Sequence, residues 1–210
     1  MKTKPLRNAP GSYALVFAAG LLAGIATRLT DFCDGSSLWG FHAIATLFGF
    51  WIISVTALVL LSSSNLCAGL NAFLYLSGMT LSFYALGFWL DSQVFRYEDA
   101  HFDTQLFLLY TGLSLACGVG AFVLYHWEKP SPWGAVLYAL PVGALLAEAL
   151  GVGIYLAGHG TYLFQFLLDI AGVLYFGLRF YRRTKSRPLY LTSVCLTAAV
   201  VYFAIYRPFL

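Results

Sequence analysis

Two carboxylic acids lie inside long apolar stretches of the sequence, where an ionisable side chain is expensive and therefore suggests a function. Glu148 lies about eight residues before the end of the stretch 133–156. Asp169 lies about eight residues after the start of the next stretch, 162–180. In two helices joined by a short loop, both acids would lie roughly 12 Å from the same membrane surface. Charged carboxyl groups at one depth repel each other, so the pair predicts a ligand site or a shared, exchangeable proton.

Three further polar side chains are expected in the same half of the membrane. Arg28 ends the first apolar stretch, His42 lies in the second, and Gln165 precedes Asp169 by one helical turn. With the two acids they predict a polar cavity that opens to the outside. Structural alternatives remain for each: Arg28 extends to the interface, His42 is a hydrogen-bonded helix residue, and the acids pair with Arg28 or with backbone donors.

The elements that position these residues are apolar helices. The chain has 210 residues, of which 60% are hydrophobic and 10% are charged, and its mean hydropathy is +0.77. A soluble domain has about 25% charged residues. Because lipid cannot satisfy backbone polar groups, the apolar stretches must be helices. We predict an all-α transmembrane bundle forming a single domain, 1–210, with about seven spans: 11–29, 38–61, 66–90, 105–127, 133–156, 162–180 and 189–206.

The positions of the basic residues predict the orientation. With the N-terminus in the cytoplasm and the C-terminus outside, nine of the 12 Lys and Arg residues fall on the inner side, as the positive-inside rule requires. They are Lys2, Lys4, Arg7, Lys129, Arg179, Arg182, Arg183, Lys185 and Arg187. This pattern predicts a multi-pass membrane protein in this orientation.

Several partners can be expected or set aside. The net charge of +3 is spread over the ends of the loops, so nucleic acid is not expected as a partner. Small residues at Ala19, Gly20, Ala23 and Gly24 form a close-packing face, directed either into the bundle or against a partner membrane protein. The four cysteines have no metal-ligand spacing, the acidic segment 98–103 is interpreted as a solvated loop, and no cofactor motif occurs.

Two segments carry a resemblance to a known family. The stretch from Asn71-Ala72-Phe73 to Gly78-Met79, and that from Ala139-Leu140-Pro141 to Leu146-Ala147-Glu148, resemble a family of small bacterial membrane proteins labelled as a domain of unknown function. This resemblance implies a multi-pass protein of the bacterial cytoplasmic (inner) membrane and supplies no activity. In size the chain is also similar to the substrate-binding subunits of energy-coupling-factor importers. Their small-residue first helix docks on a partner, but a seventh span departs from their usual six.

The sequence favours recognition or transport of a small solute across the lipid bilayer. The alternatives are a membrane-embedded enzyme that uses Glu148 and Asp169 as an acid–base pair, and an accessory subunit whose polar core is structural. An enzyme would need a nucleophile, a metal or a further base near the acids. Only Arg28, His42 and His159 are available, so the enzyme ranks second.

Overall fold

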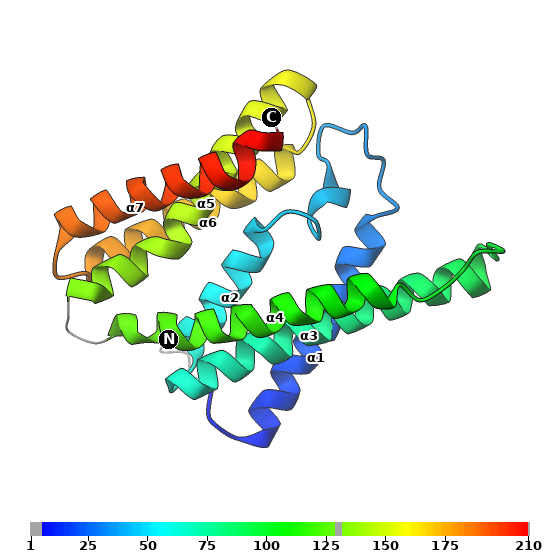
Figure 1. The fold of residues 1–210 in the computed structure, drawn as a ribbon, viewed down its shortest axis with the longest axis horizontal. Coiled ribbons are helices and arrows are strands. Elements are labelled where there is room, and N and C mark those ends of the chain that lie inside the picture. The colour runs from blue at the N-terminus through cyan, green and yellow to red at the C-terminus, as the bar shows by residue number, and fades with distance from the viewer. Residues whose placement is uncertain (1–5, 129–131, 210) are drawn as a thin grey trace. The chain divides into compact units, whose positions relative to one another are not determined.

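A computed structural model describes residues 6–128 and 132–209, in which the regular elements are helices. Contacts divide the chain into two compact units (Figure 1). Unit 1 consists of Met1–Phe32 and Ala57–Tyr125, and unit 2 of Cys33–Thr56 and His126–Leu210. Lys2, Lys4 and Lys129, which contribute to the predicted orientation, lie outside the described residues.

Unit 1 contains three long helices, of which α3 packs against both others. They are α1 (Pro10–Thr30), α3 (Asn65–Trp89) and α4 (Thr104–Leu124), and a π-helical turn, η2 (Leu90–Val94), extends α3. Gly20 and Gly24 allow α1 to approach α3, because a Cβ on either glycine would overlap the α3 backbone. The glycines of the predicted small-residue face therefore pack inside unit 1. Ala19 is exposed, and a partner protein at this face stays a prediction.

The chain returns to the start of α1 at the end of α2 (Gly49–Leu61). Leu6 forms an isolated bridge with Ser62, and its N–H donates to the carbonyl of Leu61. In α3, the buried Asn71 amide donates to Ser62 Oγ at 3.0 Å and to Cys67 Sγ at 3.3 Å. The segment between α1 and α3 thus leaves the C-terminal end of α1 and returns to its N-terminal end.

The segment predicted as the second span, 38–61, is helical only in its second half. Turns and one short 3-10 helix, η1 (Phe41–Ala43), precede α2, and Gly40 adopts a left-handed conformation with φ 59°. α2 has 13 residues, which extend about 20 Å, whereas the hydrocarbon core of a bilayer is about 30 Å thick. The prediction of a full second helix is therefore wrong, because apolar chain that packs against protein need not be helical at membrane depth.

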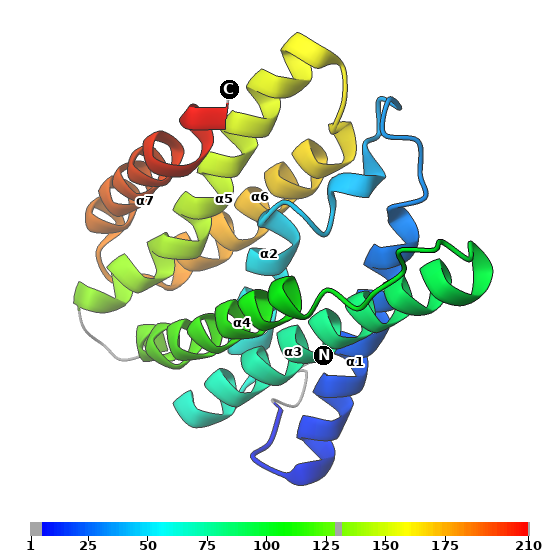
Figure 2. The same ribbon diagram turned by 45° about the vertical axis from the view of Figure 1, so that its right-hand side comes forward.

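Unit 2 is built around α5, which packs against α6 and α7 and lies between them (Figure 2). Its helices are α5 (Pro132–His159), α6 (Leu163–Arg183) and α7 (Arg187–Val201), followed by the short turns η4 (Tyr202–Tyr206) and η5 (Arg207–Phe209). Stacked rings of Trp127, Tyr138 and Phe180, all buried, close one end of the α5–α6 interface. Pro141 is tolerated inside α5 and is buried.

Six helices are long and apolar enough to cross a membrane. They are α1, α3 with η2, α4 with η3 (Tyr125–Glu128), α5, α6, and α7 with η4. Large apolar side chains on their outer faces are exposed, for example Leu15 (66%), Leu108 (61%) and Leu196 (67%). Monomeric soluble proteins rarely expose large contiguous apolar patches, so these faces suit lipid. The chain is thus a helical, multi-pass membrane protein in which six helices of the described residues are long enough to span the bilayer. The side on which each end lies stays a prediction.

Candidate ligand- or proton-binding site

A tight turn makes α5 and α6 antiparallel neighbours. α5 ends at His159 and α6 begins at Leu163. Between them Gly160 and Tyr162 adopt left-handed conformations, with φ 69° and 73°. Because only three residues connect the helices, polar side chains at a similar distance from the turn on facing sides must meet inside unit 2.

Glu148 of α5 and Asp169 of α6 meet through one shared amide. Gln165 Nε2 donates to Glu148 Oε1 at 3.1 Å and to Asp169 Oδ1 at 2.9 Å. All three side chains are 0% exposed. The prediction that the acids share a partner inside the bundle is confirmed. The acids are closed off from the surface in this conformation, and the outward-facing cavity stays a prediction.

Glu148 also lies at the beginning of α2. The backbone of Phe48 and Gly49 hydrogen-bonds its carboxyl group, and Tyr206 Oη donates to its Oε2 at 2.8 Å. The N-terminus of a helix carries unsatisfied N–H groups and a partial positive charge. Glu148 therefore lies where an N-terminal cap of α2 would lie, although it belongs to another helix, and Gln165 and Tyr206 also donate to its carboxyl group.

Gly49 allows this close approach. A Cβ at this position would overlap Asp169 Oδ1 and Gln165 Nε2. Any other residue at the start of α2 would have to displace the side chains that bridge the two acids. We call Glu148, Gln165, Asp169 and Tyr206 the carboxyl cluster. Gly49 packs directly against it.

Two oxygen atoms of the carboxyl cluster are buried without a hydrogen-bond partner among the described residues. They are Asp169 Oδ2 and Gln165 Oε1. Both atoms are potential hydrogen-bond acceptors, and leaving a buried acceptor without a donor costs about 1–3 kcal/mol of stability. These free acceptors can therefore bind a further hydrogen-bond donor, such as a protonated carboxyl group, or coordinate a small cation.

His42 does not join the carboxyl cluster by any hydrogen bond described in the structure. It lies in η1 rather than in a helical span, and its ring packs against Tyr162 with centroids 5.5 Å apart.

In the loop before η1, the N–H and the hydroxyl of Ser36 donate to the exposed carboxyl of Asp34 at 2.9 and 2.8 Å. These bonds lower the pKa of Asp34. This loop is thus ordered by local hydrogen bonds.

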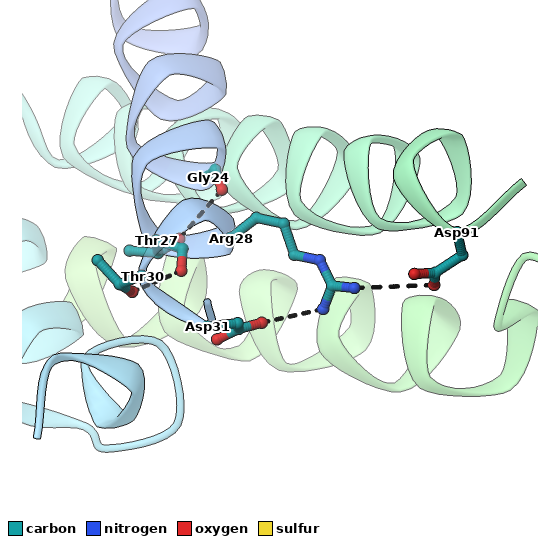
Figure 3. Close-up of polar contacts among 6 residues, drawn as sticks. All are labelled: Gly24, Thr27, Arg28, Thr30, Asp31 and Asp91. Carbon is teal, nitrogen blue, oxygen red and sulfur yellow. Dashed lines mark hydrogen bonds and ion pairs between the residues drawn. The ribbon is translucent and has the colours of Figure 1, made fainter. Parts of the chain in front are cut away.

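Arg28 belongs to unit 1 and has its own partners there (Figure 3). Its guanidinium lies 2.9 Å from Asp31, one turn along the chain, and 3.8 Å from Asp91 at the end of α3. The same group lies 5.3 Å from the ring centroid of Phe83. Its side chain is 22% exposed. This geometry suits the structural alternative, in which Arg28 ties the ends of α1 and α3 together near the interface.

Sequence reasoning missed three members of the site: Tyr206, Phe48 and Gly49. Tyr206 belongs to the π-helical turn η4, far along the chain from Glu148. In the sequence, Tyr206 is the last residue of the apolar stretch 189–206, where a tyrosine is usually explained by the membrane surface. Phe48 and Gly49 contribute through their backbone, for which an apolar sequence gives no signal.

The fold and the carboxyl cluster define a multi-pass helical membrane protein with a buried, amide-bridged pair of acids. No protein-family model, no curated protein and no solved structure matches the chain. The two family resemblances stay predictions.

Proposed function

We propose that this protein transports a small solute across a bacterial cytoplasmic membrane and that Asp169 and Glu148 form its proton- or cation-binding site. The observation that supports this most is the pair of fully buried acids held at the start of a half-length helix. Secondary transporters use discontinuous helices in this way, with helix ends directed at ions and charged groups near the middle of the membrane.

The two acids have different surroundings, which suggests different roles. Glu148 receives hydrogen bonds from Tyr206, Gln165 and the backbone of Phe48 and Gly49. Asp169 receives one from Gln165, and no described residue donates to its second oxygen. A second negative charge beside Glu148 would be repelled in a medium of low dielectric constant. We therefore assign the exchangeable proton to Asp169 and the permanent charge to Glu148.

The direction of the site is part of the proposal. We take segment 31–61, which returns to the start of α1, as an irregular seventh crossing, so that the N-terminus would lie inside and the C-terminus outside. The carboxyl cluster would then open to the outside during transport. Labelling of a cysteine introduced at position 210 tests the orientation. If a membrane-impermeant reagent labelled this cysteine only from the cytoplasmic side, the proposed orientation would be wrong.

The proton assignment can be tested on the purified full-length chain. Infrared difference spectra between low and high pH should contain the band of a buried, protonated carboxyl group. Asp169→Asn should remove that band, whereas Asp99→Asn, a change of an exposed loop acid, should leave it. Retention of the band in Asp169→Asn would contradict the assignment. If sodium in place of choline moves the loss of the band to lower pH, the site also accepts a cation.

Transport needs a separate test in proteoliposomes with an imposed pH gradient. Labelled amino acids, sugars and nucleosides would be offered one class at a time. One class should accumulate in a gradient-dependent way, and Glu148→Gln or Asp169→Asn should abolish accumulation without removing the protein from the membrane. If no class accumulates and both variants only lower thermal stability, the acids have a structural role, as in an accessory subunit.

A further inference from the structure

An apolar groove lies on unit 2 between α6 and α7, with α5 as its floor. Its volume is about 440 Å³, and its walls include Val142 of α5, Leu174 and Leu178 of α6, and Leu191 and Val194 of α7. Gly177 also lines the groove, and a Cβ there would make only ordinary contact, 3.7 Å from Val142. The groove is thus not closed by side chains from α6, although α6 and α7 both pack against α5.

The groove changes character toward the connection between α6 and α7. Tyr181 and Tyr190 line it near that connection, whereas Val173 and Leu174 line it about two turns away along α6. Tyrosine is enriched at the level of the lipid headgroups because its ring is apolar and its hydroxyl is polar. The buried Tyr190 donates its hydroxyl to the carbonyl of Gly177, whereas Tyr181 precedes the charged connection between α6 and α7, so we place the membrane interface at this end of the groove and the hydrocarbon region at its aliphatic end.

Exposed basic residues lie in the connection that follows the aromatic end along the chain. Arg182, Lys185 and Arg187 are all exposed, and none of them forms an ion pair with a carboxylate in the described part of the chain. The guanidinium of Arg187 lies 5.1 Å from the ring centroid of Tyr181, which lines the groove. Positive charge therefore lies where an apolar ligand in the groove would reach the interface.

We propose that this groove binds an anionic phospholipid, with one acyl chain along α6 and α7 and the phosphate against Arg182, Lys185 and Arg187. The apolar walls match a hydrocarbon chain, and the unpaired basic residues at one end match a negative headgroup. A polar, soluble solute would not fill the apolar walls, whereas an anionic phospholipid has both features and is present in the membrane. The proposal does not depend on the carboxyl cluster or on transport.

The full-length chain in nanodiscs tests the headgroup. Discs would contain phosphatidylcholine alone or with a small fraction of phosphatidylglycerol, and the lipid retained by the protein would be measured after exchange into detergent. Phosphatidylglycerol should be enriched over its fraction in the disc at low salt. Each basic residue near a lipid surface contributes about 1 kcal/mol, or about fivefold. Replacing Arg182, Lys185 and Arg187 together by Gln should therefore remove the enrichment, whereas Arg207→Gln, at the end of the chain, should keep it.

A second pair of variants tests the groove itself. Leu178→Trp would place a large ring in the groove, whereas Leu196→Trp adds the same ring to an exposed position of α7 outside the lining. Only the former should reduce retention several-fold, with equal thermal stability in phosphatidylcholine for both. Equal retention in the two Trp variants, or enrichment that survives the triple Gln change, would overturn the proposal and leave only nonspecific surrounding lipid. Displacement of the lipid by free glycerol phosphate at the same concentration would also overturn it, because the acyl chain would then contribute nothing.

Discussion

The substitution Gly49→Ala addresses the link between the half-length helix α2 and the carboxyl cluster. The new methyl group would overlap Asp169 Oδ1 and Gln165 Nε2, the two atoms joined by a 2.9 Å hydrogen bond. Either α2 must move away from Glu148, or the Gln165 amide must give up a carboxylate. The first response separates α2 from Glu148, and the second breaks the bridge between the acids.

The magnitude follows from three effects. Overpacking a tight interior costs about 1–3 kcal/mol, and loss of a hydrogen bond to a charged group costs about 1.5–3 kcal/mol. Alanine favours a helix over glycine by about 0.5–1 kcal/mol, which opposes these losses. We therefore expect the free energy of unfolding to fall by about 2–5 kcal/mol, and we expect the protonated carboxyl band assigned to Asp169 to shift or disappear.

A matched control separates this effect from the general effect of replacing glycine. Gly158 lies near the end of α5 in the same unit, and a Cβ there meets no atom within 4 Å. Reversible unfolding in mixed micelles should show Gly158→Ala to be as stable as the parent chain or slightly more stable. If Gly49→Ala stays within about 0.5 kcal/mol of the parent chain, the close approach of α2 to the carboxyl cluster is refuted.

Three smaller predictions concern other polar contacts. Asn71→Ala should lower the free energy of unfolding by about 1 kcal/mol, because interhelical hydrogen bonds in membranes are modest; an unchanged midpoint in mixed micelles would contradict this. Arg28→Gln should lower the free energy of unfolding by at most about 1 kcal/mol, and by less at high salt, because the ion pairs of Arg28 are partly exposed. Unfolding at two salt concentrations measures the loss and its dependence on salt. Ser36→Ala should raise the pKa of Asp34 by removing a donor, as followed by NMR of the carboxyl carbon. Since these bonds lower the pKa, the stabilisation they give is present above the ordinary Asp value and is lost as pH falls through the lowered value.

The sequence predicted those features that depend on composition and on position along a helix. Apolar length alone identified the helices that carry Glu148 and Asp169, because lipid imposes both length and helical structure. The short connection at Gly160 made α5 and α6 antiparallel, which placed the acids at related depths. Gln165, one turn from Asp169, then had to lie on the same face of α6. The pairing of the acids could be predicted from these local facts.

Features that depend on tertiary packing could not be predicted. Residues 38–48 are as apolar as a helix, but Gly40 adopts a left-handed conformation and the chain turns instead. Arg28 was expected to share a cavity with the acids, whereas its observed partners, Asp31 and Asp91, lie in unit 1. Its neighbour Asp91 comes from a helix end about sixty residues away, and no local pattern encodes that contact.

Two apparent violations of local rules in unit 2 explain each other. α2 begins at Phe48-Gly49, in an apolar sequence without the Ser, Thr, Asp or Asn that usually caps a helix. Glu148 places a carboxyl group in the interior of α5, where lipid or apolar packing would leave it without donors. The backbone of Phe48 and Gly49 supplies hydrogen bonds to that carboxyl group, and the carboxyl group supplies the missing cap. An uninterrupted second helix would have removed these backbone donors and left Glu148 with Gln165 and Tyr206 alone, so the break in the chain before α2 adds to the donors that keep an acid at this depth.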